Sequence, residues 1–358
     1  MIWTQIFMRT AVIFLVTMTT IARGQDTNAE TWTQLVDGAT VGELLVLEAD
    51  ECRLYGGGWK GIFISEDCGH NWIKTSFEGY ASTIAISGDS VFAGTTIQGV
   101  FRSDDGGWTW IPIRDGLRFN ELPDGFRYYA EVRHFLSNRG EVIAVMNYGG
   151  TYTSTDLGET WQNVSKKWFR GDNILTITEF DGYLWAAGGS ATYRSNNNGQ
   201  TWETLPRIEL RGYETDWAVL DNRLYLAGEG GIGRWNENTL TWEYLMEGFP
   251  TGKAFIHSLA VHHGRLYTGL GGWGTRGVYV FDAREETWYS VGLDEFRVFA
   301  LLSHQSYLYA STVYDDGTIQ QREPIMGIYR ARFPKLQVHG KALTRWARVK
   351  QGILALPR

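Results

Sequence analysis

The 358-residue sequence predicts an all-β fold, a seven-bladed β-propeller of four-stranded antiparallel blades, on three observations. A phrase that ends in tryptophan recurs about every forty residues, which indicates a repeat architecture. Short stretches rich in Val, Ile, Leu, Tyr and Phe lie between its copies and are broken by Gly, Asn and Asp, as in β-hairpins. Each repeat holds four such stretches, which is the content of one propeller blade.

The recurring phrase has the form Ser-x-Asp-x-Gly-x-Thr-Trp, and we call it the closing phrase because it ends each blade. Four well-formed copies are SEDCGHNW at 65–72, SDDGGWTW at 103–110, STDLGETW at 154–161 and SNNNGQTW at 195–202. In two degenerate copies, WNENTLTW at 235–242 and FDAREETW at 281–288, Glu237 and Ala283 replace the Asp. Ser and Asp side chains can bond to the backbone of a turn, Gly permits a positive φ, and Trp can fill the space between blades. We therefore assign structural roles to Ser65, Asp67, Gly69, Trp72, Ser103, Asp105, Gly107, Trp110, Ser154, Asp156, Gly158, Trp161, Ser195, Asn197, Gly199 and Trp202.

The strand-like runs can be followed from blade to blade. They read TIAISGDSVFAGTTIQGVFRS at 83–103, ILTITEFDGYLWAAGGSATYRS at 174–195 and SLAVHHGRLYTGLGGWGTRGVYVF at 258–281. Residues 298–332 supply three further runs without a closing phrase, whereas ETWTQLV at 30–36 matches ETWQNV at 159–164. We expect this N-terminal segment to complete the seventh blade, because closing the ring leaves no exposed sheet edge. Rings of six or eight blades are the alternatives.

Residues 25–334 form the predicted propeller, preceded by a signal peptide at 1–24 and followed by a basic tail at 335–358. The apolar run AVIFLVTMTTIA at 11–22 ends at Ala22, and Ala22 and Gly24 supply small residues before Gln25, which is typical of a cleaved secretory signal. A secreted or periplasmic protein follows from this, with a buried first strand or an uncleaved anchor as alternatives. No later run approaches the roughly 18 apolar residues of a membrane span. The tail carries six Lys or Arg and no acid, so it is either a solvated tail or an attachment to an anionic polymer or partner.

Charge and cysteine content exclude several classes of function. The 33 Lys and Arg against 40 Asp and Glu argue against nucleic-acid binding, which favours a basic surface. The two cysteines, Cys52 and Cys68, both lie in the first blade, where a disulfide between them and two separate thiols are both open. No Cys or His spacing predicts a metal site, and no glycine loop predicts a phosphate-bearing cofactor.

The closing phrase resembles the Asp-box, or BNR repeat, of sialidases, sortilin-type receptors, xyloglucanases and photosystem II assembly factors. The resemblance covers about residues 30–334 and implies the fold more than the activity, because these relatives include hydrolases, receptors and assembly chaperones. Sialidases require an arginine triad and an early Arg-Ile-Pro segment, which IPIR at 111–114 and PRIE at 206–209 do not match. Xyloglucanases pair two propellers around a cleft with two acids, whereas this sequence predicts one ring.

Propellers bind ligands where the loops between blades and the loops joining second and third strands converge on the axis, and we call this the mouth face. One residue at the start of each innermost strand should surround the channel there: Glu43, Thr83, Arg133, Asn173, Asp216, His257 and Arg297. Mixed charges suit a polar or anionic ligand, and Arg could hold a carboxylate; mutual pairing of solvated charges is the alternative. The ligand-binding candidates are Arg133, Asp216, His257, Arg297, Trp59 and Trp273.

Aromatic residues and one long insertion also map to the mouth face. Trp59, Tyr148 and Trp273 fall in loops between second and third strands, and Tyr128, Tyr129, Trp168 and Tyr213 fall between blades. The insertion at 114–133 is the longest inter-blade loop, and such loops often carry function. We expect an exported, non-catalytic propeller that binds a glycan or protein ligand, with no catalytic residue assigned. The alternative is a divergent, sialidase-like glycoside hydrolase, which a pair of carboxyl groups converging in the central pocket would favour.

Overall fold

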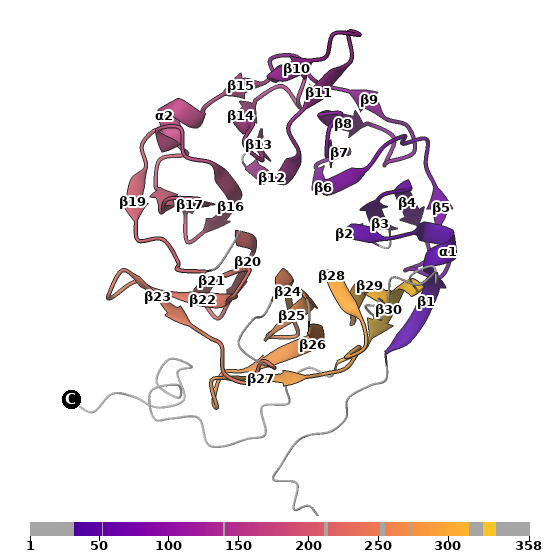
Figure 1. Cartoon of the computed structure of the whole chain (residues 1–358), viewed down its shortest axis with the longest axis vertical. Coiled ribbons are helices and arrows are strands. Elements are labelled where there is room, and N and C mark those ends of the chain that lie inside the picture. Colours follow the sequence, from indigo (N-terminus) through magenta and orange to yellow (C-terminus); the bar gives the residue numbers. More distant parts are fainter. Residues whose placement is uncertain are drawn as a thin grey trace, which may run out of the picture.

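The computed structural model describes residues 32–333 except 52, 139, 211–213, 251–254, 273 and 315–324. The signal peptide and the basic tail expected from the sequence lie outside the described residues. Within them, seven four-stranded antiparallel sheets surround a central axis, as predicted (Figure 1).

Each blade runs from an innermost strand at the axis to an outer strand at the rim. In that order, blade 1 holds β2 (Leu44–Asp50), β3 (Arg53–Gly58), β4 (Gly61–Ser65) and β5 (Ile73–Lys74), and blade 2 holds β6 (Ala81–Ser87), β7 (Ser90–Thr95), β8 (Val100–Ser103) and β9 (Ile111–Pro112). Blade 3 holds β12 (Val132–Asn138), β13 (Glu141–Met146), β14 (Gly150–Ser154) and β15 (Gln162–Asn163), and blade 4 holds β16 (Ile174–Phe180), β17 (Tyr183–Gly188), β18 (Thr192–Ser195) and β19 (Glu203–Leu205). Blade 5 holds β20 (Glu214–Leu220), β21 (Arg223–Gly228), β22 (Gly231–Asn236) and β23 (Thr241–Tyr244), and blade 6 holds β24 (Ile256–His262), β25 (Arg265–Gly272), β26 (Thr275–Asp282) and β27 (Thr287–Ser290).

Blade 7 joins the two ends of the described chain. Its strands are β28 (Arg297–His304), β29 (Tyr307–Tyr314), β30 (Ile325–Ala331) and β1 (Thr33–Asp37), and β1 pairs antiparallel with β30 so that Thr33 lies opposite Arg330. The Trp32 indole donates a hydrogen bond of 2.9 Å to the Val291 carbonyl of blade 6, which fixes the entry into β1. The predicted closure of the ring by the N-terminal segment is confirmed.

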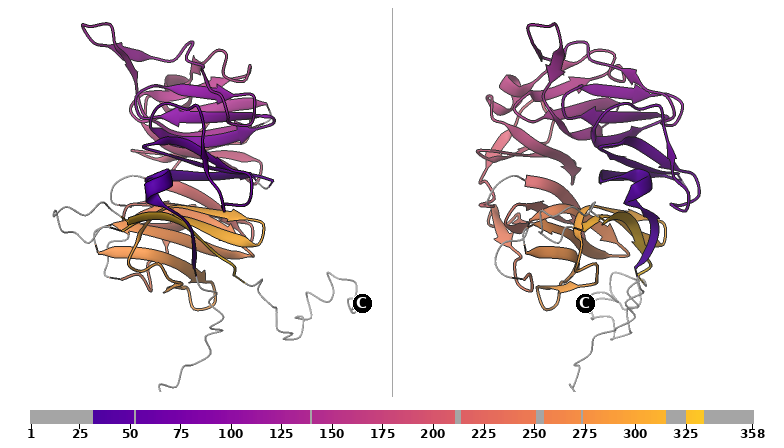
Figure 2. Two further views of the ribbon diagram at one scale, coloured as in Figure 1. Left: turned by 90° about the vertical axis from the view of Figure 1, so that its right-hand side faces the viewer. Right: turned by 45° about the vertical axis from the view of Figure 1, so that its right-hand side comes forward.

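Three elements lie outside the blades. The short helix α1 (Gly38–Val41) leads from β1 into blade 1, and the helix α2 (Ser165–Phe169) follows blade 3. The insertion predicted at 114–133 forms a hairpin of β10 (Phe119–Glu121) and β11 (Arg127–Tyr129), which projects beyond the ring (Figures 1 and 2).

All seven innermost strands share one irregularity near their first residues. The register slips by one residue between Leu44 and Val46 in β2, between Glu214 and Asp216 in β20, and at the equivalent place in the other five. Such a bulge re-aims the side chains that follow it. The bulges therefore decide which side chains of each innermost strand face the axis.

The closing phrases form nearly identical turns on the face opposite the mouth. In blade 2, the Ser103 hydroxyl donates to Asp105 at 2.7 Å and accepts from the backbone N–H of Gly107 at 2.8 Å. Asp105 in turn accepts from the backbone N–H of Thr109 at 2.9 Å. The same Ser-to-acceptor and Gly-to-Ser bonds recur in blades 1, 3 and 4. These turns therefore satisfy their own polar groups.

The degenerate phrases bond their turns through the residue before the missing Asp, since Asn236 accepts from the backbone N–H of Asn238 and Asp282 accepts from that of Arg284. Glu237, which stands where the Asp is missing, pairs with Arg194 of blade 4 at 2.7 Å and accepts from the Trp235 indole at 2.7 Å. Arg234 of blade 5 pairs likewise with Glu286 of blade 6 at 2.9 Å. Such charge pairs are not confined to the degenerate phrases, because Arg102 of blade 2 pairs with Glu159 in the well-formed phrase of blade 3 at 2.9 Å.

Candidate functional site

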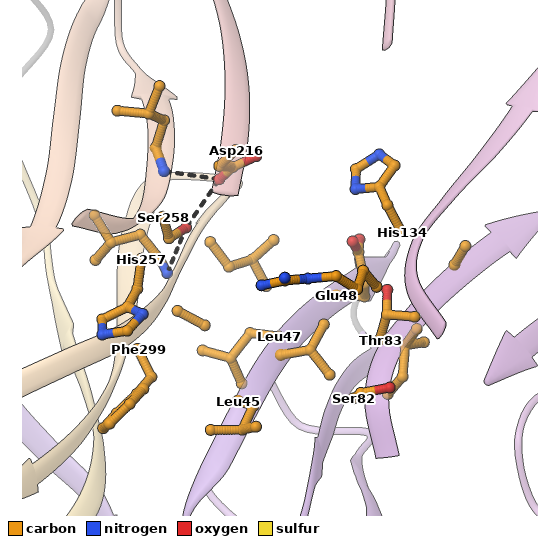
Figure 3. Close-up of a pocket in the computed structure, with 18 of the residues that line it drawn as sticks. Leu45, Leu47, Glu48, Ser82, Thr83, His134, Asp216, His257, Ser258 and Phe299 are labelled. Carbon is orange, nitrogen blue, oxygen red and sulfur yellow. Dashed lines mark hydrogen bonds between the residues drawn. The ribbon is translucent and has the colours of Figure 1, made fainter. Parts of the chain in front are cut away.

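A central pocket of about 740 Å³ runs along the axis and is lined by residues of all seven blades. The innermost strands provide most of the wall, and the loops that carry Trp59 and Tyr80 provide its rim on the mouth face. Figure 3 shows Asp216, His257 and Phe299 on one side and Glu48, Thr83 and His134 on the other. The pocket therefore brings together side chains that are far apart in the sequence.

The residues predicted to surround the channel fall on this wall with one exception. The lining includes Glu43, Thr83, Arg133, Asp216, His257 and Arg297. Asn173 is turned away from it and accepts a hydrogen bond of 2.8 Å from the backbone N–H of Tyr148. Trp59 lies at the rim, whereas Trp273 lies outside the described residues. Whether these side chains bind a ligand stays a prediction.

Two carboxyl groups share the pocket, and both have a raised pKa. Burial raises the pKa of Asp216 to about 6, although the backbone N–H groups of Leu259 (2.7 Å) and Trp217 (2.8 Å) bond to its oxygens and favour the ionised form. Burial, and then the charge of Asp216, raise the pKa of Glu48 to about 7. Asp216 thus ionises first, and its negative charge opposes ionisation of Glu48. Near neutral pH one group is an acid and the other a carboxylate.

Two histidines line the pocket from opposite sides, both in their neutral form. Burial lowers the pKa of His134 to about 4, against a hydrogen bond with the backbone of Ile177. Burial and the neighbouring positive charge of Arg297 lower the pKa of His257 to about 4. At neutral pH the imidazoles therefore add hydrogen-bonding groups to the pocket but no positive charge.

The blade 7 side of the mouth is a packed cluster around a glycine. Arg297 donates to the carbonyl of Gly271 at 2.8 Å, and its guanidinium lies 5.1 Å from the centroid of the Phe299 ring. The His257 ring lies 4.8 Å from the Phe299 ring. A Cβ on Gly271 would come within 2.4 Å of the His257 ring, so only glycine leaves room for this arrangement. Arg297 is thus fixed in orientation on this wall.

Sequence reasoning missed Glu48 and His134, and it misplaced Trp168. Glu48 is the one acid within the otherwise apolar run LLVLEA at 44–49, and this was the available signal. Trp168, expected among the exposed aromatics, is buried in α2 against Phe169 and Trp202, because the SKKWF segment turns its apolar end inward. Cys52 lies outside the described residues, so the disulfide with Cys68 and the two separate thiols both stay open.

Across the described ranges, no helix is long and apolar enough to cross a bilayer. No group of three or more His, Cys, Asp or Glu side chains in the same ranges could hold a metal ion.

Two xyloglucanases are similar to this chain in sequence. No protein-family model matches the chain. Xyloglucanase Xgh74A of Acetivibrio thermocellus is 26% identical over 250 residues, which cover 56% of this chain and 29% of the relative. A xyloglucanase of a Paenibacillus species is 23% identical over 229 residues, which cover 50% of this chain and 22% of the relative. The chain thus spans less than a third of the length of these curated relatives.

Solved structures support the fold. YCF48 from Cyanidioschyzon merolae superposes with a TM-score of 0.59 at 16% identity, covering 85% of this chain and 99% of that one. The extracellular domain of the putative one component system BT4673 from B. thetaiotaomicron gives 0.60 at 15% identity, covering 83% and 42%. The GH74 xyloglucanase from Xanthomonas campestris gives 0.54 at 16% identity, covering 82% and 44%. These likenesses show a shared propeller fold.

Proposed function

We propose that this chain is a glycoside hydrolase that acts on a neutral glucan of the xyloglucan class at its central pocket. The observation that carries the proposal is the pair of carboxyl groups, Glu48 and Asp216, on the wall of one pocket. Environments that push the pKa values of two acids apart are a feature of acid and base assignments in hydrolases. The names of the sequence relatives supply the substrate class.

The two groups divide the chemistry between them. Protonated Glu48 gives its proton to the glycosidic oxygen as the bond from the sugar carbon to that oxygen breaks. Ionised Asp216 either attacks the sugar carbon or takes a proton from the water that does so, and water supplies the hydroxyl of the product. Activity should fall below pH about 6 as Asp216 becomes protonated and above pH about 7 as Glu48 loses its proton.

The charge of the pocket favours a neutral ligand over the anionic one considered from the sequence. Its wall holds the carboxyl groups of Glu43, Glu48, Glu131 and Asp216 but only the guanidinium groups of Arg133 and Arg297. The histidines add no positive charge at neutral pH, because their pKa values are near 4. Even with Glu48 protonated, carboxylates outnumber guanidinium groups, and a carboxylate ligand would meet net repulsion.

The test is release of reducing sugars from xyloglucan and unbranched β-glucans by the full chain. We expect Glu48→Gln to lower the rate by on the order of 10³-fold or more, because a general acid is lost. Asp89→Asn, at an exposed turn on the opposite face, is the matched control and should leave the rate unchanged. Equal rates in the wild type and Glu48→Gln would exclude the assignment.

A non-catalytic glycan-binding propeller is the second candidate, and one observation favours it. Asp216 accepts from the Ser258 hydroxyl at 3.2 Å and from Leu259, so it also ties blade 5 to blade 6 (dashed lines in Figure 3). If Asp216 serves to hold these two blades together, its presence in the pocket does not require a catalytic role. Binding of xyloglucan without any release of sugar would support this candidate.

Two further parts of the proposal concern family and location. We propose that the closing turns are Asp-boxes, supported by the Ser–Asp–Gly bonding that recurs in the blades with well-formed phrases. We also propose that residues 1–24 direct export, supported by their sequence pattern. N-terminal sequencing of the exported protein should begin at Gln25.

A further inference from the structure

One tryptophan at the rim of the central pocket is both exposed and held in place. Trp59 sits between Gly58 and Gly61 in the tight turn that joins β3 to β4. A Cβ on Gly58 would lie 1.9 Å from the carbonyl oxygen of Glu43, and Gly61 has a φ of +107°, so both positions require glycine. The turn is thereby pinned against the start of β2, and Trp59 has little backbone freedom.

The Trp59 side chain is fixed on one face and along one edge. Its ring stacks on Tyr80 at 4.4 Å between centroids and 22° between planes. Along one edge it also lies close enough to the Glu43 carboxylate to favour the ionised form of that group. Even so, Trp59 is 64% exposed. A large aromatic surface left open to water, but immobilised from behind, loses little side-chain entropy when a ligand covers it.

The groups around this ring suit a sugar. The apolar C–H face of a pyranose can cover the open face of an indole, while its hydroxyl groups point outward along the ring edge. Glu43 and Glu131 line the same rim and offer carboxylate acceptors to those hydroxyls. An anionic sugar would be repelled by the same two groups.

We infer that Trp59, backed by Tyr80, is the platform of a sugar subsite at the rim of the central pocket, and that a neutral hexopyranose lies on it with hydroxyl groups bonded to Glu43 and Glu131. The inference rests on the proposed function, because it names how the same pocket holds its glycan. Since Trp59 lies on the mouth face and Glu48 lies further along β2, the platform holds a sugar outside the one that reaches the carboxyl pair.

The test uses the full chain, soluble xyloglucan oligosaccharides and cello-oligosaccharides. Affinity is measured by titration calorimetry and by retardation in native gels that contain xyloglucan. Trp59→Ala should weaken binding about tenfold or more, and Trp59→Tyr should recover most of it, because a flat ring is restored. Tyr289→Ala is the matched control: it removes an aromatic residue, 39% exposed, from the outer strand β27 away from the pocket lining, and should leave affinity unchanged.

The outcomes separate this inference from the hydrolase proposal. Loss of binding in Trp59→Ala, in a chain that releases no sugar, supports the platform and rejects the hydrolase. Sugar release with the same KM in the wild type and Trp59→Ala overturns the platform and leaves the hydrolase intact. Absence of binding by the wild type to every oligosaccharide and to the gel overturns both.

Discussion

The two faces of the ring use carboxyl groups in opposite ways. On the closing-phrase face, Asp67 and Asp156 accept hydrogen bonds from backbone N–H and hydroxyl groups, which lower the pKa of each to about 2. In the pocket, burial dominates and raises the pKa of Glu48 to about 7 and that of Asp216 to about 6. An acid that is satisfied by its own turn stabilises the fold, whereas an acid held in a pocket at the cost of desolvation is available for chemistry.

Opening the ring should have the largest effect on stability, because both faces depend on blade 7. Deletion of residues 25–36 removes all of β1 except Asp37 and exposes the edge of β30. We expect a sharp fall in the melting temperature, or loss of cooperative unfolding, by calorimetry and circular dichroism. Deletion of residues 25–30 alone, which leaves β1 in place, is the control and should melt like the full chain. A wild-type melting curve without β1 would mean that the ring closes in another way.

Removing tryptophans of the closing phrases tests how evenly that face supports the core. Trp161 is only 4% exposed, and its indole donates to the Ile113 carbonyl at 3.1 Å, so Trp161→Ala should cost about 3–5 kcal/mol. Trp110 and Trp202 are only partly buried, contrary to their expected equivalence with Trp161, and should cost about 2–3 kcal/mol. Urea titrations give the free energies of unfolding. Equal costs at all three sites would refute this ranking.

Replacing Glu48 should have the smallest effect on stability of the three changes. The folded chain holds a proton on Glu48 up to pH about 7, whereas the unfolded chain releases it near pH 4.5, so this group destabilises the fold as pH rises through that window. Glu48→Gln should therefore be more stable than the wild type by about 1–3 kcal/mol at pH 8 and by little at pH 4. Buried His134 and His257 act with the opposite sign, so the variant's stability should rise with pH more steeply than that of the wild type. Parallel curves from pH 4 to 8 would show that Glu48 is solvated.

The fold could be predicted from the sequence because its determinants are local and repeated. The closing phrase and the runs between its copies define each blade, and the match of 30–36 to the 159–164 phrase identified the strand that closes the ring. The short helix α2 could not be predicted, because SKKWF is too short to show a helical period.

The site was predictable only in part, for a geometric reason. Arg133, Asp216 and His257 were found because they stand near the start of innermost strands. Glu48 stands deeper in β2, and whether its side chain faces the axis depends on the bulge between Leu44 and Val46. Neither composition nor period reveals a bulge. The coupling of Glu48 with Asp216 therefore emerged only from the folded ring.

The latch between β1 and β30 also sets an order of assembly. As the chain leaves the ribosome, β1 is made before any blade, yet its only sheet partner, β30, is the last strand of the described chain to be made. Blades 1 to 6 can each form from contiguous chain, while blade 7 must wait for an encounter between distant segments, which is slow because a long loop has to close. We therefore expect translation to end before the ring closes. Until then, an unpaired strand is the point at which a chaperone, or a second nascent copy, can intervene.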